Sequence, residues 1–435
     1  MNFNDPARAL ALRLLCDFET TGAPLDQLLE GLEARLPAAL DRRFARHLVL
    51  GVTRWQVRLD WIIGRFTRRP LESCDPATRQ ILRLGAYQLL HLDKVPPRAA
   101  VHTSVELAKR HAPRGVPELV NAVLRRVAAT AASPPLPERG EDLAGHLSIC
   151  HSHPRWLVER WLERWGTAAV EALLEADNQQ PPLYIRLNPL RPTSPPPEAR
   201  PAGYLPGFFA LDDSESFFQS AAFREGHCQV QDINAGLPVA LLEPQPGEQI
   251  LDACSAPGGK ATQLATQMQD QGLVVAADLS ARRLGLVREN QDRLGLRSLR
   301  LLVEDARVGQ SGPFDRVLVD APCSATGTLA RHPDVRWRKR PEQLPGLSAT
   351  QYIMLCRSFA RLRPGGVLVY STCSLEVEEN TAVVERFLGA TPAARLEAAA
   401  PFFPGKSWAG TFVQTLPGRE AGDGCFAARF RRGTR

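Results

Sequence analysis

Two cysteines occupy equivalent positions in this sequence, each a few residues beyond a short apolar run. Cys323 follows the run 314–320, and Cys373 follows the run 366–370. Short runs rich in Val and Leu are typical of buried strands. If the two strands are neighbours in a parallel sheet, both cysteines lie at the same edge of it. A lone cysteine is most often a small buried hydrophobe, but two at matching strand ends indicate chemistry.

Methylation of an unreactive carbon is a reaction that suits such a pair. C5 of cytosine is a poor nucleophile, but a thiolate that adds to C6 makes C5 behave like an enamine carbon, which can attack a methyl group on a sulfonium. A carboxyl group at the N3 edge of the pyrimidine helps that addition. A second thiol or base can then help to expel the enzyme once the C5 proton has left.

A glycine-rich turn follows the strand predicted over 249–252. Gly258 and Gly259 permit positive φ and let a ligand approach the backbone. The spacing matches neither the dinucleotide motif GxGxxG nor the P-loop GxxxxGK[ST]. Asp278 ends the next strand, where a carboxylate accepts hydrogen bonds from both hydroxyls of a ribose, and a further carboxylate, Asp305, follows the third strand. These features together exceed what a turn in any α/β domain requires, and they favour S-adenosylmethionine, a ligand with ribose and adenine but no phosphates.

Alternating strands and helices from residue 236 onward must position these residues. Strands are predicted over 249–252, 273–278, 299–303, 314–320 and 366–370, with a last edge strand over 424–430. This alternation predicts an α/β domain with a largely parallel, doubly wound, Rossmann-like sheet. Ligands bind such sheets beyond the carboxyl ends of the strands, where each motif above falls.

The first 132 residues show a helical pattern only. Apolar residues recur at spacings of three and four, and β-branched runs are absent. Helices are predicted over 6–19, 42–66, 75–92, 98–112 and 117–129, with a further leucine stripe over 25–36. Asp75 followed by Pro76 is typical of a helix cap and first turn. A proline-rich break over 133–137 then ends this all-α part.

The stretch 141–235 has a mixed pattern. A helix is predicted over 154–178 and an extended segment over 183–187. This combination indicates a small mixed α/β module, a second candidate for RNA binding. We therefore expect three domains: an all-α domain over 1–132, this module, and the catalytic domain over 236–435.

The composition limits the class of protein. With 435 residues, 44% apolar and 23% charged, the chain is neither mainly disordered nor a coiled coil nor collagen-like. No apolar window is long enough to span a membrane, and the N-terminus lacks the basic head and apolar run of a signal peptide. The nine cysteines form no CxxC pair, so we expect neither disulfides nor a metal site, and we expect a cytoplasmic protein.

Positive charge is concentrated in the first part of the chain. Residues 1–130 hold 20 Lys and Arg against 13 Asp and Glu, whereas the remainder holds 33 against 34. The excess favours a polyanion such as RNA, although a solvated arginine-rich face is the alternative. A second basic run directly after Cys323 contains Arg331, Arg336 and Arg338. We expect these arginines to hold RNA phosphates, with Trp337 packing the loop or stacking on a base; a solvated helix start is the alternative.

Several motifs together resemble the RNA 5-methylcytosine methyltransferases. The likeness is carried by residues 252–262, Asp278, Glu304-Asp-Ala, Asp320-Ala-Pro-Cys-Ser and Ser371-Thr-Cys-Ser. The N-terminal region resembles the RNA-binding helical domain of antitermination factors, through Val95-Pro-Pro-Arg-Ala-Ala-Val and Val120-Asn-Ala-Val-Leu-Arg-Arg. This fusion, which covers nearly the whole chain, is similar to the bacterial ribosomal RNA small subunit methyltransferase B type.

The resemblance implies a role for each motif. Cys373 corresponds to the nucleophile, Cys323 to the cysteine that assists product release, and Asp320 to the aspartate that contacts the target base. The residues implied in binding S-adenosylmethionine are Cys254, Ser255, Ala256, Pro257, Gly258, Gly259, Lys260, Asp278, Asp305 and Asp320. The implied substrate is a specific cytosine of 16S ribosomal RNA, methylated through a covalent Cys–C6 intermediate by a monomeric enzyme without metal.

The sequence departs from the family pattern in two places. Glu304 stands where a glycine is usual, and the segment 231–237 replaces a more usual Gln-Asp-x-Ser/Ala-Gln pattern.

Three alternatives stay open at this point. The cysteine motifs do not separate transfer RNA from ribosomal RNA, although the helical domain favours ribosomal RNA. A non-catalytic RNA-binding or antitermination scaffold would not need the cysteine pair or the carboxylates. An amino-methylating enzyme would need an Asn/Asp-Pro-Pro-aromatic motif, which Asp320-Ala-Pro-Cys is not.

Overall fold

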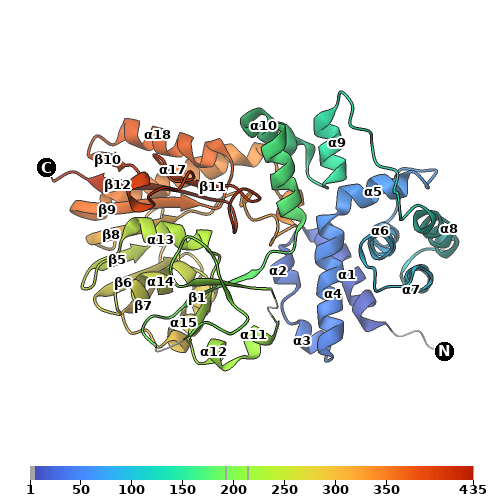
Figure 1. Cartoon of the computed structure of the whole chain (residues 1–435), viewed down its shortest axis with the longest axis horizontal. Coiled ribbons are helices and arrows are strands. Elements are labelled where there is room, and N and C mark those ends of the chain that lie inside the picture. Colours follow the sequence, from blue (N-terminus) through green and yellow to red (C-terminus); the bar gives the residue numbers. More distant parts are fainter. Residues whose placement is uncertain (1–4, 192–193, 213–214, 435) are drawn as a thin grey trace. The chain divides into compact units, whose positions relative to one another are not determined.

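The computed structural model describes residues 5–191, 194–212 and 215–434, which form two compact units (Figure 1). Unit 1 comprises the described residues up to Asn178 together with the segment His332–Arg338, and it is helical. Unit 2 comprises Gln179–Arg331 and the described residues from Lys339 onward, and it contains the mixed sheets. The predicted fold class, a helical part followed by a Rossmann-like α/β part, is confirmed.

The helices of unit 1 largely follow the apolar spacing of the sequence. They are α1 (Pro6–Thr21), α2 (Leu25–Leu28), α3 (Leu32–Arg35), α4 (Ala39–Arg54), α5 (Gln56–Gly64), α6 (Pro76–His91), α7 (Pro97–His111), α8 (Val116–Ala129), α9 (Leu143–Cys150), α10 (Arg155–Asn178) and α16 (Val335–Arg338). Asp75 caps α6 as predicted, because its carboxylate accepts a hydrogen bond from the Thr78 amide. The single helix predicted over 42–66 is wrong, since the non-helical backbone of Trp55 separates α4 from α5.

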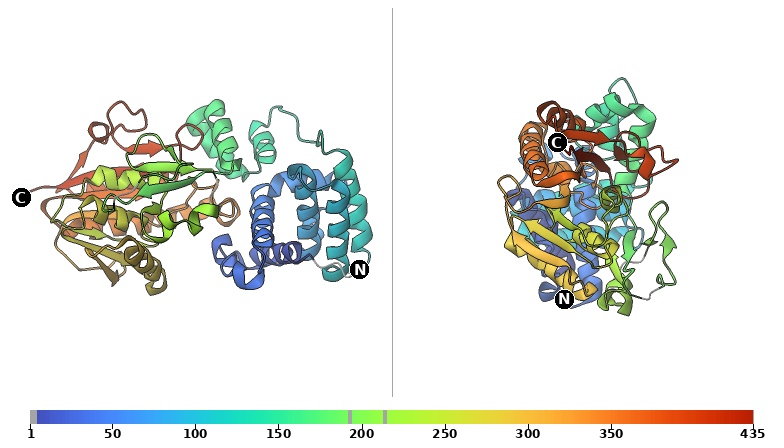
Figure 2. Two further views of the ribbon diagram at one scale, coloured as in Figure 1. Left: turned by 60° about the horizontal axis from the view of Figure 1, so that its bottom comes forward. Right: turned by 90° about the vertical axis from the view of Figure 1, so that its left-hand side faces the viewer.

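A leucine-rich core holds the helices of unit 1 together. Leu15, Leu48, Leu82 and Leu124 come from α1, α4, α6 and α8 and are almost fully buried. Helices α6, α7 and α8 lie side by side in both views of the structure (Figures 1 and 2). The three- and four-residue spacing of the sequence therefore marks the buried faces of these helices.

The segment His332–Arg338 is part of unit 1, although unit 2 residues precede and follow it in the sequence. Arg336 is 1% exposed, and its guanidinium donates hydrogen bonds to the carbonyls of Arg54, Ser152 and Asp177 and to the side chain of Asn178. Burial lowers the pKa of Arg336 to about 9. The predicted contact of Arg336 with RNA phosphates is therefore wrong for this fold, because the guanidinium is enclosed by backbone carbonyls.

The two residues after Arg336 are also bound within unit 1. The Trp337 indole donates a hydrogen bond to the carbonyl of Thr53 at 2.7 Å. Of its two predicted roles, packing and stacking on a base, this contact corresponds to packing. Arg338 donates to the carbonyl of Gly22 and to Asp334, and about a quarter of its side chain stays exposed. A run of positive charge in the sequence here marks a packing segment.

The main sheet of unit 2 has the order β10-β12-β9-β8-β5-β6-β7. Its strands are β5 (Gln249–Asp252), β6 (Leu273–Asp278), β7 (Leu299–Val303), β8 (Phe314–Asp320), β9 (Leu362–Thr372), β10 (Ala394–Glu397) and β12 (Cys425–Arg432), and β11 (Val413–Thr415) pairs with β12. The five predicted strands are confirmed and pair in parallel. The last predicted strand is not an edge, because β12 lies between β9 and β10.

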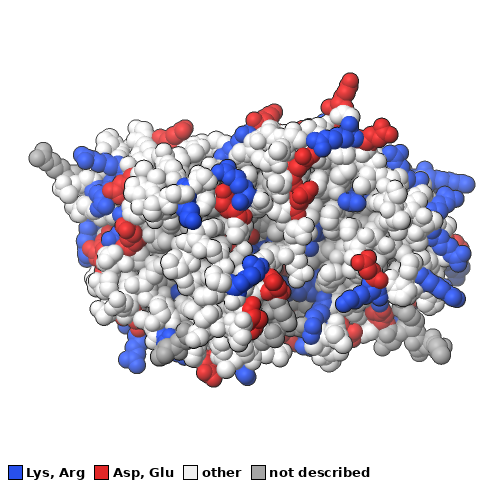
Figure 3. All heavy atoms as spheres, in the orientation of Figure 1, with Lys and Arg blue, Asp and Glu red and all other residues white. Residues whose placement is uncertain are grey.

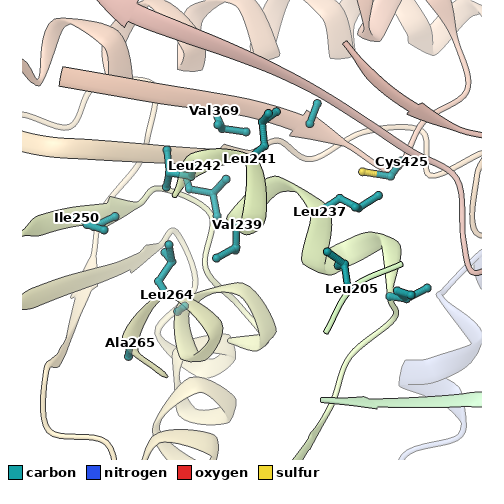
Figure 4. Close-up of a cluster of buried hydrophobic side chains, with 14 of the residues drawn as sticks. Leu205, Leu237, Val239, Leu241, Leu242, Ile250, Leu264, Ala265, Val369 and Cys425 are labelled. Carbon is teal, nitrogen blue, oxygen red and sulfur yellow. The ribbon is translucent and has the colours of Figure 1, made fainter. Parts of the chain in front are cut away.

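Helices cover both faces of this sheet (Figure 1). One face packs against α13 (Leu237–Leu242), α14 (Gly259–Gln267) and α15 (Ala281–Leu294), and the other against α17 (Leu344–Ala360) and α18 (Thr381–Ala390). Figure 4 shows the first core, where Leu237, Val239 and Leu241 of α13 contact side chains of the sheet. Burial on both faces explains why the strands read as nearly continuous apolar runs.

A smaller antiparallel sheet precedes the main one in unit 2. It consists of β1 (Leu183–Leu187), β2 (Arg200–Pro201), β3 (Phe208–Leu211) and β4 (Cys228–Val230), in the order β2-β3-β1-β4, with α11 (Glu215–Gln219) and α12 (Ala221–Arg224). The helices of the stretch 141–235 up to Asn178 thus lie in unit 1, and its strands lie in unit 2. Among the described residues, no helix has the length and apolar character needed to cross a membrane.

We expect Arg336→Ala to lower the free energy of unfolding of unit 1 by roughly 3–5 kcal/mol, because it leaves several buried carbonyls without a donor. Six of the seven tryptophans belong to unit 1, so the denaturation of the full chain followed by tryptophan fluorescence reports on it. The control Arg338→Ala should cost below about 1 kcal/mol, since its side chain is partly exposed. Equal, small losses for both variants would contradict this role of Arg336.

Candidate functional site

The two predicted cysteines meet at the carboxyl edge of the main sheet. Strands β8 and β9 are parallel neighbours in which Asp320 pairs with Ser371, so the loops after them begin side by side. The Sγ atoms of Cys323 and Cys373 are 3.4 Å apart. The sequence argument that neighbouring strands bring the two thiols together is therefore confirmed as geometry.

Close backbone contact fixes the approach of the two cysteine loops. The amide of Gly327 donates to the carbonyl of Cys373 at 2.9 Å, and the amide of Gly424 donates to the carbonyl of Gly327 at 2.7 Å. A Cβ atom at Gly327 would lie 2.7 Å from the Cys373 carbonyl oxygen, closer than side chains tolerate. Glycine at this position thus lets the loop of Cys323 reach that of Cys373.

The thiol pair contains one group that is held in its neutral form. The hydrogen bond to Cys373 and then burial raise the pKa of Cys323 well above its usual value. Cys323 is therefore a neutral thiol at neutral pH, in contact with the sulfur of Cys373. This arrangement is suited to a reaction in which Cys373 reacts while Cys323, beside it, stays protonated.

Lys260 and Asp320 form an ion pair beside the thiols. The Nζ of Lys260 lies 2.6 Å from one carboxylate oxygen of Asp320, and the hydroxyl of Ser371 donates to the other at 2.8 Å. Burial opposes the charge of Lys260, but the Asp320 carboxylate outweighs it and raises the pKa of this lysine. The sequence placed Lys260 in the cofactor loop and did not reveal that it binds the aspartate expected to contact the base.

The loop between β5 and α14 is tied to the end of β6. The Ser255 amide donates to the carbonyl of Ala277 at 2.8 Å, and the Ala256 amide lies 3.3 Å from the carboxylate of Asp278. Gly258 has a φ of +104°, and a Cβ atom there would meet Val287 at 3.1 to 3.3 Å. The predicted glycine therefore serves a left-handed turn in close contact with α15.

A buried carboxylate without a well-formed hydrogen bond marks this loop as a place for a ligand. Both carboxylate oxygens of Asp252 and the hydroxyl of Ser255 are buried and have no such partner within the described ranges. Burial, followed by the charge of Asp320, raises the pKa of Asp252 to about 7. A ligand that brings ammonium or hydroxyl donors fits this set of acceptors.

The two carboxylates expected at the cofactor site, Asp278 and Asp305, are paired with arginines in this structure. Asp278 lies 3.3 Å from Arg283, which also donates to the carbonyl of Ala256, and Asp305 lies 2.7 Å from Arg307. The hydrogen bonds of Arg307 lower the pKa of Asp305. A ligand that binds either carboxylate would therefore displace the arginine or bind beside it.

The glutamate that departs from the family pattern has partners in the fold. The Glu304 carboxylate lies 2.6 Å from the guanidinium of Arg361, which also donates to the carbonyl of Ser311. The Glu304 amide donates to the carbonyl of Asp278 at 3.2 Å. The backbone before Asp305 thus stays joined to β6, while the side chain fixes the loop that follows.

The second departure, over 231–237, is accommodated by packing. Asn234 donates to the carbonyls of Ala421 and Asp423. A Cβ atom at Gly236 would lie 2.5 Å from the ring of Phe208, so a larger residue there would displace this ring. The altered residues therefore hold the loop before β5 in place.

Arg331 contributes to the fold of unit 2 and is not free to bind phosphate. Its guanidinium donates to Asp232, Asp423 and the carbonyl of Pro182 at 3.0 to 3.2 Å. Two carboxylates neutralise its charge, and only 22% of the side chain is exposed. The predicted RNA contact of Arg331 is therefore not supported by its surroundings. Among the described residues, no group of three His, Cys, Asp or Glu side chains is arranged to hold a metal ion.

The chain is similar in sequence to proteins of known families. Residues 239–431 match the model of the family described as 16S rRNA methyltransferase RsmB/F, residues 5–129 match the NusB family, and residues 153–195 match the ferredoxin-like domain of RsmF/B-like methyltransferases. A probable ribosomal RNA small subunit methyltransferase B of Synechocystis is 38% identical, with 88% of this chain and 89% of the relative covered. The ribosomal RNA small subunit methyltransferase B of Salmonella arizonae is 34% identical, with 97% of each chain covered.

Solved structures share the fold. The crystal structure of PH0851 matches 99% of this chain and all of its own, with a TM-score of 0.79 and 24% identity. The structure of NSun6 from Pyrococcus horikoshii with SFG matches 65% of this chain and 98% of its own, with a TM-score of 0.55 and 21% identity.

We expect Asp278→Asn to weaken binding of S-adenosylmethionine by about 1.5–3 kcal/mol, the usual value of a hydrogen bond to a charged group. Calorimetry on the full chain measures this loss. Asp292→Asn is the control, because this aspartate is exposed on α15. Unchanged affinity in Asp278→Asn would remove Asp278 from the cofactor site.

Proposed function

Because the chain belongs to the RsmB/F family of 16S rRNA methyltransferases, we propose that it transfers a methyl group from S-adenosylmethionine to C5 of a cytosine in small-subunit ribosomal RNA. The observation that carries the C5 assignment is the pair of thiols 3.4 Å apart beside Lys260 and Asp320. Methylation of an amino group or a ribose needs no such pair, whereas addition to a pyrimidine ring uses it.

The proposed cofactor fits the residues of the loop after β5. Asp252, Asp278 and the backbone of 254–260 would hold it, because they place carboxylate and backbone groups at the edge of the sheet. When bound, S-adenosylmethionine supplies an electrophilic methyl group on a sulfonium sulfur. The related structure of NSun6 contains SFG, an analogue of this cofactor, which supports the choice.

The chain's own residues account for the remaining steps. The thiolate of Cys373 forms a bond to C6 of the cytosine, and the displaced electron pair makes C5 nucleophilic. The negative charge that this addition places on the ring at N3 is neutralised by a proton delivered through the Lys260–Asp320 ion pair, whose carboxylate Ser371 also holds. After methyl transfer a water molecule takes the C5 proton, the electron pair of that C–H bond restores the C5–C6 double bond, and the C6–S bond breaks. The neutral thiol of Cys323 donates a hydrogen bond to the departing sulfur.

The relatives favour ribosomal RNA over transfer RNA as the substrate, because they are ribosomal RNA small subunit methyltransferases and match nearly the whole length of this chain. A non-catalytic scaffold is disfavoured by the geometry of the two thiols, since binding alone does not require Cys323 and Cys373 in contact.

The test of the proposed function is the formation of 5-methylcytosine by the purified chain on small-subunit RNA. We expect Cys373→Ala to abolish it, because the remaining thiol, Cys323, is held in its neutral form and does not add to C6, while the affinity for S-adenosylmethionine changes little. Mapping 5-methylcytosine in the RNA, with calorimetry for the cofactor, measures both. Activity within about tenfold of the wild type would contradict covalent addition by Cys373.

Loss of the second thiol should have a different outcome. We expect Cys323→Ala to accumulate a covalent complex of protein and RNA through Cys373, because addition still occurs but release is slow. A denaturing gel with labelled RNA shows the complex as a shifted band, and Cys323→Ala combined with Cys373→Ala should remove it. Normal turnover without a shifted band would exclude Cys323 from release.

Unit 1 offers a basic surface for the RNA on α7, on α8 and on the short segments that precede them. Residues 94–126 contain seven Lys and Arg, all exposed, against two Glu. Figure 3 shows Lys and Arg side chains at the right-hand edge, where Figure 1 draws these helices. Since Arg331 and Arg336 are engaged in the fold, we place the main phosphate contacts on this surface.

We expect Arg114→Glu combined with Arg126→Glu to weaken RNA binding and to reduce its salt dependence by about two counterions. Fluorescence anisotropy across a salt titration measures both. Arg297→Glu combined with Arg395→Glu, an equal change of charge at exposed positions of unit 2, is the control and should have a smaller effect. Equal effects of the two double variants would indicate unspecific electrostatics.

A further inference from the structure

A fully buried glutamate lies behind the two cysteines. Glu379 ends the short 3-10 turn Val377–Glu379 and is 0% exposed. One carboxylate oxygen accepts hydrogen bonds from the Ser324 amide at 2.8 Å and from the side-chain amide of Gln351 at 2.9 Å. The other oxygen accepts from the hydroxyls of Ser324 and Ser374. Four donors therefore surround one carboxylate.

These donors belong to the two loops that carry the reactive thiols. Ser324 directly follows Cys323, and Ser374 directly follows Cys373. The hydroxyls of the two serines are also 2.8 Å apart. Glu379 is thus a single group that binds the residue next to each thiol, while neither thiol is held by a regular element at that point.

The carboxylate is itself fixed from both sides. Gln351 of α17 donates to the carbonyl of Pro322 as well as to Glu379, so the residue before Cys323 is held by the same side chain. The Tyr370 hydroxyl donates to the Glu379 carbonyl at 2.6 Å. The side chain of Asn380 accepts from Thr372 and donates to the Ser374 carbonyl. The glutamate therefore cannot move without disturbing β9 and α17.

A carboxylate is suited to this place because it only accepts hydrogen bonds. Burying a charge is costly unless its hydrogen bonds are made, and here both oxygens have two donors each. An amide of the same shape would turn its own N–H groups toward one pair of donors. The charge of Glu379 is also among the causes that raise the pKa of Cys323, after the hydrogen bond to Cys373 and burial.

We infer that Glu379 is a positioning residue for product release, which holds the loop of Cys323 against the loop of Cys373. The inference rests on the proposed function, since release matters only if Cys373 forms the adduct. Glu379 touches neither thiol through a hydrogen bond, so it acts through Ser324 and Ser374. Its loss should let the two sulfurs separate while the Cys373 thiolate can still add to C6.

The experiment compares Glu379→Gln with the wild type in the full chain. We expect steady-state formation of 5-methylcytosine to fall by about 10- to 100-fold, with a covalent protein–RNA complex accumulating on a denaturing gel. The KM for RNA and the affinity for S-adenosylmethionine should change less than about twofold, because the cofactor loop and the basic surface are not involved. Glu385→Gln, exposed on α18, is the matched control and should behave as the wild type.

Two further variants keep the inference falsifiable if Glu379→Gln does not fold. Ser324→Ala removes one hydroxyl but keeps the hydrogen bond that the backbone amide of residue 324 donates to Glu379. It should therefore slow release to a smaller extent, and the covalent complex should again accumulate. Combining Cys323→Ala with Ser324→Ala should give no more complex than Cys323→Ala alone, because both act on the same thiol.

The outcomes separate this inference from the proposed function. If the wild type forms no 5-methylcytosine, the proposed function fails. If the wild type is active and Glu379→Gln and Ser324→Ala turn over normally, only the role of Glu379 is overturned. The same holds if these variants lose activity without any covalent complex, since that loss would come from a damaged Cys373 loop.

Discussion

The parallel pairing of β8 with β9 is the constraint on which the site depends. Asp320 stands opposite Ser371 in this pair, so the loops that follow begin at the same level and their thiols meet 3.4 Å apart. A slip by one residue would turn every side chain of one strand to the opposite face and separate the loops. Helices cover both faces of the sheet and leave each strand one compatible register. Packing far from the thiols therefore sets their separation.

Beyond the strand ends, buried polar side chains replace regular structure. Glu379 joins the two cysteine loops, Lys260 holds Asp320, and Glu304 with Arg361 holds the loop after β7. Each of these groups is costly to bury alone and is stabilised only when its partners are in place. The loops at this edge are consequently ordered before a substrate arrives, which is the condition for oriented addition to a ring carbon.

The sequence predicts those parts of the molecule that depend on local pattern. The five parallel strands, the capped start of α6 and the meeting of Cys323 with Cys373 follow from spacing and chain order. The position of β12 inside the sheet does not, because the short partner strand β10 has little apolar pattern and strand order is a tertiary property. The burial of Glu379 is not predicted for the same reason. A glutamate in a polar turn is usually exposed, and only the folded loops of Ser324 and Ser374 enclose it.

The arginines after Cys323 show that a basic run in a sequence does not by itself establish contact with phosphates. A basic run predicts contact with phosphates because free guanidinium groups usually face solvent. Arg336 instead uses its donors on backbone carbonyls, and Arg331 is neutralised by Asp232 and Asp423. Arginine offers five N–H donors in a rigid fork. A buried arginine can therefore join several chain segments by donating hydrogen bonds to carbonyls that have no partner in regular structure. In a chain with only five lysines, arginine must fill both roles, and burial decides which one each residue has. Net charge in a sequence therefore indicates RNA binding only when the buried arginines are left out of the count. In unit 1 the exposed Lys and Arg residues of α7 and α8 still favour RNA binding.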